Sequence, residues 1–207
     1  MNRGFILGVI AMAAIVVISN ILVQYLLGNW LTWGAFTYPF AFLVTDIMNR
    51  LYGASNARKV VLVGFVVGVI SSFIGTQIVG EFGPLVTLRI AIGSGVAFLV
   101  AQLVDVFVFN KLRAGKWWRA PLASTLVGSS LDTALFFTIA FSAMFISTEP
   151  SNDVSWAGEM IPMLGLGPVV PLWVSLAVAD WFVKLSLALI ALIPFRMLVN
   201  KWQGTTA

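Results

Sequence analysis

Hydrophobic residues in this chain are concentrated in long continuous runs that short polar connections separate. Six such runs are present, at residues 5–27, 30–50, 59–79, 85–110, 119–146 and 171–196. A helix needs about 20 apolar residues to cross the roughly 30 Å hydrocarbon core of a bilayer, and each run is long enough. The pattern therefore predicts an all-α integral membrane protein with six transmembrane helices, folded as a single transmembrane domain over residues 1–207.

Charged residues in the connections predict how these helices are oriented. Basic residues lie before the first run and after the second, fourth and sixth: Arg3, Arg50, Arg58, Lys59, Lys111, Arg113, Lys116, Arg119, Arg196 and Lys201. The alternate connections contain only acidic charges: Glu81, Glu149, Asp153 and Glu159. Because cytoplasmic loops are enriched in Lys and Arg, we expect both termini to be cytoplasmic.

Six spans with both ends on one side allow a 3+3 inverted repeat, an arrangement that is frequent in transporters. Asp46 in the second run and Asp132 in the fifth would then be approximate counterparts. The two halves share little local identity, so a bundle without an internal repeat is an equally good interpretation.

Composition agrees with a membrane protein and narrows its chemistry. The chain is 60% hydrophobic and 10% charged, whereas a soluble domain averages about 45–50% apolar and about 25% charged residues. Histidine and cysteine are both absent, which removes the commonest metal ligand, disulfides and thiolate nucleophiles. We therefore expect no metal, no cofactor and no enzymatic activity.

Six charged residues lie inside the apolar runs, where a charge near the bilayer centre costs at least about 2.5–3.5 kcal/mol. They are Asp46, Asp105, Asp132, Asp180, Arg89 and Lys184. Such residues usually face a bundle interior or a water-filled cavity. Their number favours a polar cavity through the bundle and hence a transporter.

Several of these charges lie near the ends of their runs, which favours structural or gating roles. Asp46 and Arg50 have the i,i+4 spacing of a helical ion pair, and both are close to the cytoplasmic side. Asp105 shares a helix face with Gln102 near the same side. Arg89 lies one turn inside the fourth run from the outer surface.

The deeper charges are better candidates for binding. Asp132 lies 13 residues beyond Arg119, or roughly 20 Å along a helix, in an otherwise apolar run. We expect it to bind a ligand, an ion or a proton. Asp180 and Lys184 have i,i+4 spacing near the middle of the sixth run, so they either bind ligand or form a structural ion pair.

The second run contains a proline in a cluster of aromatic residues. Pro39 removes a backbone hydrogen bond, which predicts either a helix break that exposes backbone groups to a ligand or a simple kink. Tyr38 and Phe40 are deep enough to stack on a planar ring. In the first run, Asn20 and Gln24 occupy one face of the predicted helix.

At these positions the chain resembles the queuosine precursor transporter family, also called the vitamin uptake transporter family. The longest match is TWGAFTYPFAFLVTD at residues 32–46. Further matches are LYG at 51–53, ARK at 57–59, DVFVFNKLR at 105–113, APLAST at 120–125, Ser130, DT at 132–133, FTIAF at 137–141, and the pair Asp180 and Lys184. The resemblance covers most of the chain and departs at Arg50, where many members carry an acidic residue.

The resemblance implies an importer in the bacterial inner membrane for 7-cyano-7-deazaguanine and 7-aminomethyl-7-deazaguanine, which serve queuosine salvage for transfer RNA. For such a purine-like substrate, Asp132, with or without Asp180, would accept the N–H donors of the guanidine-like edge. Tyr38 or Phe40 would stack on the ring. The amide side chains of Asn20, Gln24 or Gln102 would meet the carbonyl or the 7-substituent.

Three other functions compete with this interpretation. The chain would also suit the substrate-binding membrane subunit of a multi-component vitamin or nucleobase importer. An intramembrane enzyme acting on lipid lacks a recognisable nucleophile and base here, and a structural scaffold needs fewer buried charges. The expected partners are the small-molecule substrate and the lipid bilayer, without nucleic acid; a homodimer is compatible with a chain of this size.

Overall fold

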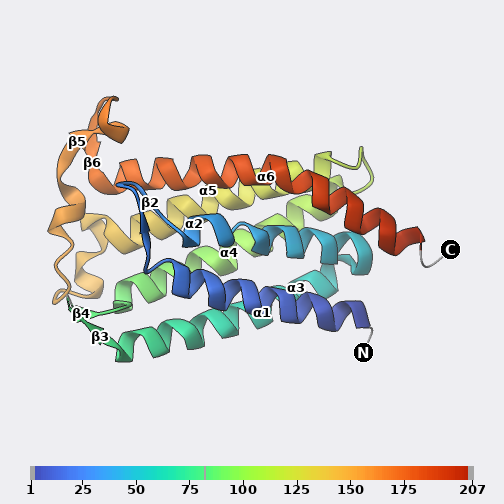
Figure 1. Cartoon of the computed structure of the whole chain (residues 1–207), viewed down its shortest axis with the longest axis horizontal. Coiled ribbons are helices and arrows are strands. Elements are labelled where there is room, and N and C mark those ends of the chain that lie inside the picture. The colour runs from blue at the N-terminus through green and yellow to red at the C-terminus, as the bar shows by residue number, and fades with distance from the viewer. Residues whose placement is uncertain (1–2, 82, 205–207) are drawn as a thin grey trace.

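The computed structural model describes residues 3–81 and 83–204 as a bundle of helices that lie side by side (Figure 1). The remaining positions of the expected 1–207 domain lie outside the described residues. The helices are α1 (Arg3–Leu22), α2 (Gly34–Thr37), α3 (Phe40–Gln77), α4 (Leu88–Leu112), α5 (Arg119–Phe141) and α6 (Leu172–Gly204). Five helical stretches in the described residues are long and apolar enough to cross a membrane; α2 and α3 together form one of them.

Helix α3 reverses direction at Gly53, so the connection expected at residues 51–58 is reduced to one non-helical residue (Figure 1). Gly53 has φ 82° and ψ 164°, a conformation that is essentially restricted to glycine. The helical arms on its two sides correspond to the second and third predicted spans. The chain therefore turns back without leaving the helix for more than a single residue.

Three short antiparallel hairpins lie at the opposite end of the bundle from this reversal (Figure 1). They pair β1 (Leu26–Leu27) with β2 (Leu31–Thr32), β3 (Val79–Gly80) with β4 (Gly83–Pro84), and β5 (Met160–Pro162) with β6 (Val169–Pro171). The same region holds the 3-10 helices η1 (Ala143–Thr148), η2 (Ser155–Gly158) and η3 (Met163–Gly165). The register of the first hairpin places Leu26 opposite Thr32.

These hairpins explain two differences from the predicted spans. The first run was expected to continue to residue 27, but α1 ends at Leu22 because the following leucines enter β1. The fifth run was expected to reach residue 146, but α5 ends at Phe141. There the hydroxyl of Ser142 accepts a hydrogen bond from the backbone N–H of Met144 and begins η1.

The opposite end of the bundle carries both marked ends of the chain, the Gly53 reversal and the α4–α5 connection (Figure 1). The basic connections of the sequence therefore meet at one end of the molecule, and the acidic ones meet at the hairpin end. Between the two ends, an apolar core joins α1, α3 and α4. It consists of Met12, Val16, Ala41, Met48, Ala57, Val60, Val61, Phe98 and Val106.

Candidate functional site

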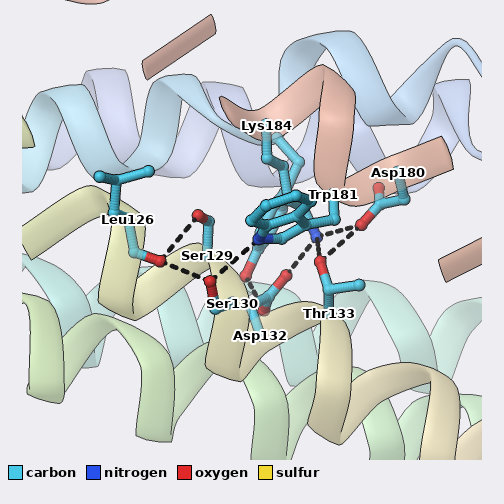
Figure 2. A network of polar contacts seen from close by, with 9 residues as sticks. Leu126, Ser129, Ser130, Asp132, Thr133, Asp180, Trp181 and Lys184 are labelled. Carbon is cyan, nitrogen blue, oxygen red and sulfur yellow. Dashed lines mark hydrogen bonds and ion pairs between the residues drawn. The ribbon is translucent and has the colours of Figure 1, made fainter. Parts of the chain in front are cut away.

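Lys184 of α6 lies in the interior of the bundle between two carboxylates. Its Nζ is 2.7 Å from Oδ2 of Asp132 on α5 and 2.6 Å from Oδ2 of Asp180, one turn earlier on α6 (Figure 2). The three side chains are 5%, 6% and 13% exposed, respectively. A buried ammonium group is stable when it is paired and hydrogen-bonded, and this arrangement provides both.

Two hydroxyl groups complete the network. Thr133 Oγ1 donates to Asp180 Oδ2 at 2.8 Å and accepts from Lys184 Nζ at 3.0 Å. Tyr38 donates its hydroxyl hydrogen to Asp132 Oδ1 at 2.8 Å. We define these five residues, Tyr38, Asp132, Thr133, Asp180 and Lys184, as the lysine cluster.

Tyr38 reaches the cluster from the junction of α2, which ends at Thr37, and α3, which begins at Phe40. Tyr38 and Pro39 both keep right-handed helical dihedral angles, and the Tyr38 N–H donates to the Gly34 carbonyl, so the chain follows a helical path through Pro39. The Tyr38 ring contacts Phe42 and Phe98 edge-on, with ring centroids 6.2 and 6.1 Å away. Its face lies beneath Lys184, whose Nζ is 5.4 Å from the ring centroid, within the range of a cation–π contact.

The arrangement leaves hydrogen-bond acceptors but no spare ammonium donors. Lys184 has three N–H donors, and Asp132, Asp180 and Thr133 take them. An ionised carboxylate has about four acceptor positions, and Asp132 receives two hydrogen bonds. With both aspartates ionised, the cluster carries one net negative charge. It is therefore suited to a ligand that presents N–H donors or a positive charge.

Sequence reasoning omitted Thr133 and Trp181 from the candidate residues. Thr133 adjoins Asp132 in the one polar stretch of an otherwise apolar run, and this stretch is the signal that could have identified it. Trp181 Nε1 donates to Ser130 Oγ at 2.9 Å, and Ser130 in turn donates to the carbonyl of Leu126 (Figure 2). This contact ties α6 to α5 beside the cluster.

Gln102 lies in a separate polar group between α3, α4 and α5. Its Oε1 accepts from Thr45 Oγ1 at 2.6 Å. In the same group, Asp46 Oδ1 accepts from Ser124 Oγ at 3.0 Å and Asp46 Oδ2 accepts from Thr125 Oγ1 at 3.2 Å. Asp105 completes the group and is fully buried.

The other candidate side chains are also placed away from the lysine cluster. Phe40 lines a pocket between α3, α5 and α6 and is 42% exposed. Asn20 donates to the carbonyl of Val16 in its own helix. Gln24 is exposed and follows the end of α1, so it does not share a helix face with Asn20.

The two arginines predicted as structural or gating charges bind backbone carbonyls. Arg50 Nη1 donates to the carbonyl of Arg113 at 2.7 Å. Asp46 and Arg50 form no ion pair in the described part of the chain, although their i,i+4 spacing allows one. Arg89 is fully buried and donates to the carbonyls of Ile139 and Ser142, which closes the C-terminal end of α5.

Comparison with protein-family models gives a match, described as "Putative vitamin uptake transporter", over residues 32–199. This range contains every residue of the lysine cluster. No solved structure matches the chain significantly.

Curated relatives point to the same family. A protein of Haemophilus influenzae named "Probable queuosine precursor transporter" is 37% identical over 175 residues, which cover 79% of this chain and 66% of that protein. The "Queuosine precursor transporter" of Escherichia coli is 34% identical over 197 residues, covering 88% of this chain and 80% of that protein. A third relative, from Bacillus subtilis, is 28% identical over 195 residues and is named "Probable queuosine precursor transporter".

Proposed function

The chain belongs to the vitamin uptake transporter family, and on that premise we propose that it imports 7-deazaguanine precursors of queuosine across the bacterial inner membrane. The observation that supports this most directly is the lysine cluster, a buried and negatively charged polar site inside a bundle of apolar helices. A structural scaffold gains little from such a site, because an apolar core of similar volume is often at least as stable.

The proposed binding step is an exchange of hydrogen-bond partners at Asp132. The ring N–H and the exocyclic amino group of a 7-deazaguanine lie on one edge of the base and are both donors. In the proposal they replace the Tyr38 hydroxyl and the Lys184 ammonium on the two Asp132 oxygens. Each donor lost from Asp132 is then matched by a donor of the base.

Asp180 allows Lys184 to leave Asp132 without becoming an unpaired charge. Leaving a buried charge unpaired costs about 3–5 kcal/mol. Because Lys184 Nζ is also 2.6 Å from Asp180 and 3.0 Å from Thr133, it keeps an ion pair and a hydroxyl contact when it leaves Asp132. Two carboxylates for one lysine therefore let the site open without an unpaired cation.

Tyr38 would supply the stacking surface. Its ring is held edge-on by Phe42 and Phe98. Phe40, Asn20, Gln24 and Gln102 are given no ligand contact in this proposal, because each lies outside the lysine cluster.

We further propose that the chain crosses the membrane six times, with the two arms of α3 counted separately and both termini in the cytoplasm. The distribution of basic residues supports this orientation, since they meet at the end of the bundle that carries the Gly53 reversal (Figure 1). The 3+3 inverted repeat stays a prediction; in it, Asp46 and Asp132 would be counterparts.

The test is salvage in bacteria that neither make nor import deazaguanines. Cells expressing this chain are given each precursor at low concentration, and queuosine in transfer RNA is measured by boronate-gel mobility. We expect restored queuosine with the intact chain and with Asp153→Asn, a change in an exposed loop. We expect none with Asp132→Ala at equal membrane abundance.

Absence of queuosine with the intact chain, when the protein is inserted and folded, would contradict the proposed substrate. Restoration only when an ATPase complex copurifies would favour the alternative function, a subunit of a multi-component importer.

A further inference from the structure

A second buried polar group lies between the lysine cluster and the basic end of the bundle. It contains two carboxylates, Asp46 of α3 and Asp105 of α4, which are 2% and 0% exposed. Hydrogen bonds from Thr45 to Gln102 and from Asn49 to the Val106 carbonyl hold α3 against α4 on both sides of the pair, so the two carboxylates lie near each other. The established family and the proposed substrate site leave this carboxylate pair without a role.

Hydrogen-bond donors are sufficient for one of these carboxylates but not for both. Asp46 receives the hydroxyl hydrogens of Ser124 and Thr125, one on each oxygen. Neither oxygen of Asp105 has a hydrogen-bond partner among the described residues, although Ser124 is next to it. Since a hydroxyl has one hydrogen, Ser124 cannot serve both aspartates.

Among the described residues, the surrounding helices place one nearby cation against two carboxylates. On α3, Arg50 lies one turn beyond Asp46 and acts on it electrostatically, but its guanidinium donates to the Arg113 carbonyl and lies over the Phe109 ring. On α4, the Lys111 ammonium lies over the Phe107 ring. On α5, the groups that face the pair are the neutral hydroxyls of Ser124 and Thr125.

On α6, the residues that line the pocket beside Asp46 are all apolar: Leu187, Ala188, Ala191, Leu192 and Phe195. Lys184 is held in the lysine cluster. The charge on α1 is Arg3, at its first residue. Two ionised carboxylates in this position would each have to bear several kcal/mol of desolvation.

One bound proton would supply the hydrogen-bond donor that the pair lacks and would remove one of its two negative charges. We propose that Asp46 and Asp105 form a proton-binding site that loads and releases one proton in each transport cycle. The proton makes an O–H bond on Asp105 and a hydrogen bond to Asp46, so the pair carries one negative charge and Asp105 gains a partner. Release to water leaves both carboxylates ionised.

Unpartnered amide atoms mark the same place. Gln102 Nε2 and Asn49 Oδ1 are fully buried, belong to this layer of the bundle and have no hydrogen-bond partner among the described residues. A pocket of about 20 Å³ lies beside Asp46 and Thr125, which is enough for about one water molecule. A water molecule in this pocket could take the proton from the carboxylate pair or return it.

The pair is in mechanical contact with the lysine cluster through α5. A Cβ atom on Gly128 would lie 2.8 Å from Phe42 Cε1 and 3.2 Å from Asp105 Cβ, so these groups pack directly on the helix. Asp132 lies about one turn beyond Gly128, and Phe42 also contacts Tyr38. A shift of α5 or Tyr38 on ligand binding therefore reaches Asp105.

The proton site itself is tested by infrared spectroscopy, without any substrate. In the full-length protein in lipid at neutral pH, we expect a protonated-carboxyl C=O band that shifts in D₂O and on labelling aspartate with ¹³C. The Asp105→Asn variant supplies an N–H donor in place of the proton, so the band should disappear. Asp153→Asn, in an exposed loop, should retain it.

Two results would overturn the proton site. One is the absence of such a band in the wild-type protein. The other is a band that persists unchanged in the Asp46→Asn/Asp105→Asn double variant, provided that the variant elutes as the same monodisperse species as wild type.

Coupling is tested in proteoliposomes with 7-cyano-7-deazaguanine, a neutral base, and it rests on the proposed function. With an acidic exterior, the wild type and Asp153→Asn should accumulate the base several-fold above equilibrium. Asp105→Asn should lose this accumulation while keeping exchange of labelled for unlabelled base. Accumulation in Asp105→Asn equal to wild type, or accumulation that follows a sodium gradient instead, would overturn the coupling role.

The two failures are distinguishable. If the wild type exchanges no base at all, the proposed substrate is wrong, and the infrared measurement still decides whether Asp46 and Asp105 hold a proton.

Discussion

At the scale of single residues, the main feature of the site is that Lys184 has two carboxylate partners on different helices. Its pair with Asp180 follows from the i,i+4 spacing, which is visible in the sequence. Its pair with Asp132 joins residues 52 positions apart. The Tyr38 hydroxyl donates to the same aspartate from a distance of 94 positions in the sequence. Such contacts are set by how helices pack, so local spacing does not predict them.

The Tyr38 hydroxyl should compete with the ligand. Tyr38→Phe keeps the ring and its contacts with Phe42 and Phe98 but removes the donor to Asp132. A hydrogen bond to a charged group contributes about 1.5–3 kcal/mol. If the base has to replace this hydroxyl, the variant should bind 7-cyano-7-deazaguanine more tightly, by about tenfold, in equilibrium titration.

The matched control for this change is Tyr25→Phe, because Tyr25 is exposed in the connection after α1. Its affinity should equal that of the wild type. Weaker binding in Tyr38→Phe would show instead that the hydroxyl donates to the ligand itself.

At the scale of helices, a single glycine, Gly53, determines the path of α3, the longest helix. Hydropathy placed a polar connection near residues 51–58, where Asn56, Arg58 and Lys59 interrupt the apolar run. These residues are nevertheless helical, because Gly53 alone reverses the chain. Hydropathy reports which residues avoid lipid, and it does not distinguish a polar helical turn from a loop.

The conformation of Gly53 makes a specific prediction for stability. An alanine there would meet no atom within 4 Å, so the penalty comes from the backbone alone and should be about 1–3 kcal/mol. Gly53→Ala should therefore lower the midpoint of thermal unfolding in detergent.

Gly68→Ala is the control within the same helix. Its Cβ would be at ordinary contact distance, 3.5 Å from Val16 Cγ1, and alanine favours a helix over glycine by roughly 0.5–1 kcal/mol. It should leave the midpoint unchanged or raise it. Equal midpoints for Gly53→Ala and wild type would mean that the reversal does not require glycine.

At the scale of the whole molecule, charge divides the bundle into a basic end and an acidic end. The division follows from the sequence alone, because no connection between the apolar runs mixes charges of opposite sign. The apolar runs also located the helices that are long enough to cross a membrane. They did not reveal the hairpins β1–β2, β3–β4 and β5–β6, since apolar residues in a short strand resemble those at a helix end.

Orientation is testable because the chain contains no cysteine. Two exposed positions are suitable for single cysteine substitutions: Lys116 in the α4–α5 connection and Asp153 at the hairpin end. With cytoplasmic termini, an impermeant maleimide should label Asp153→Cys in intact spheroplasts and Lys116→Cys only after lysis. The reverse pattern would mean that the termini face outward.

The central claim is that Asp132 receives the donors of a 7-deazaguanine base. Its most direct test is the affinity of the purified protein for 7-cyano-7-deazaguanine, compared among wild type, Asp132→Asn and the loop variant Asp153→Asn. Loss of a carboxylate acceptor for the base should weaken binding about a hundredfold in Asp132→Asn, or about 3 kcal/mol, while Asp153→Asn binds as wild type does. Equal affinity for wild type and Asp132→Asn would contradict the account.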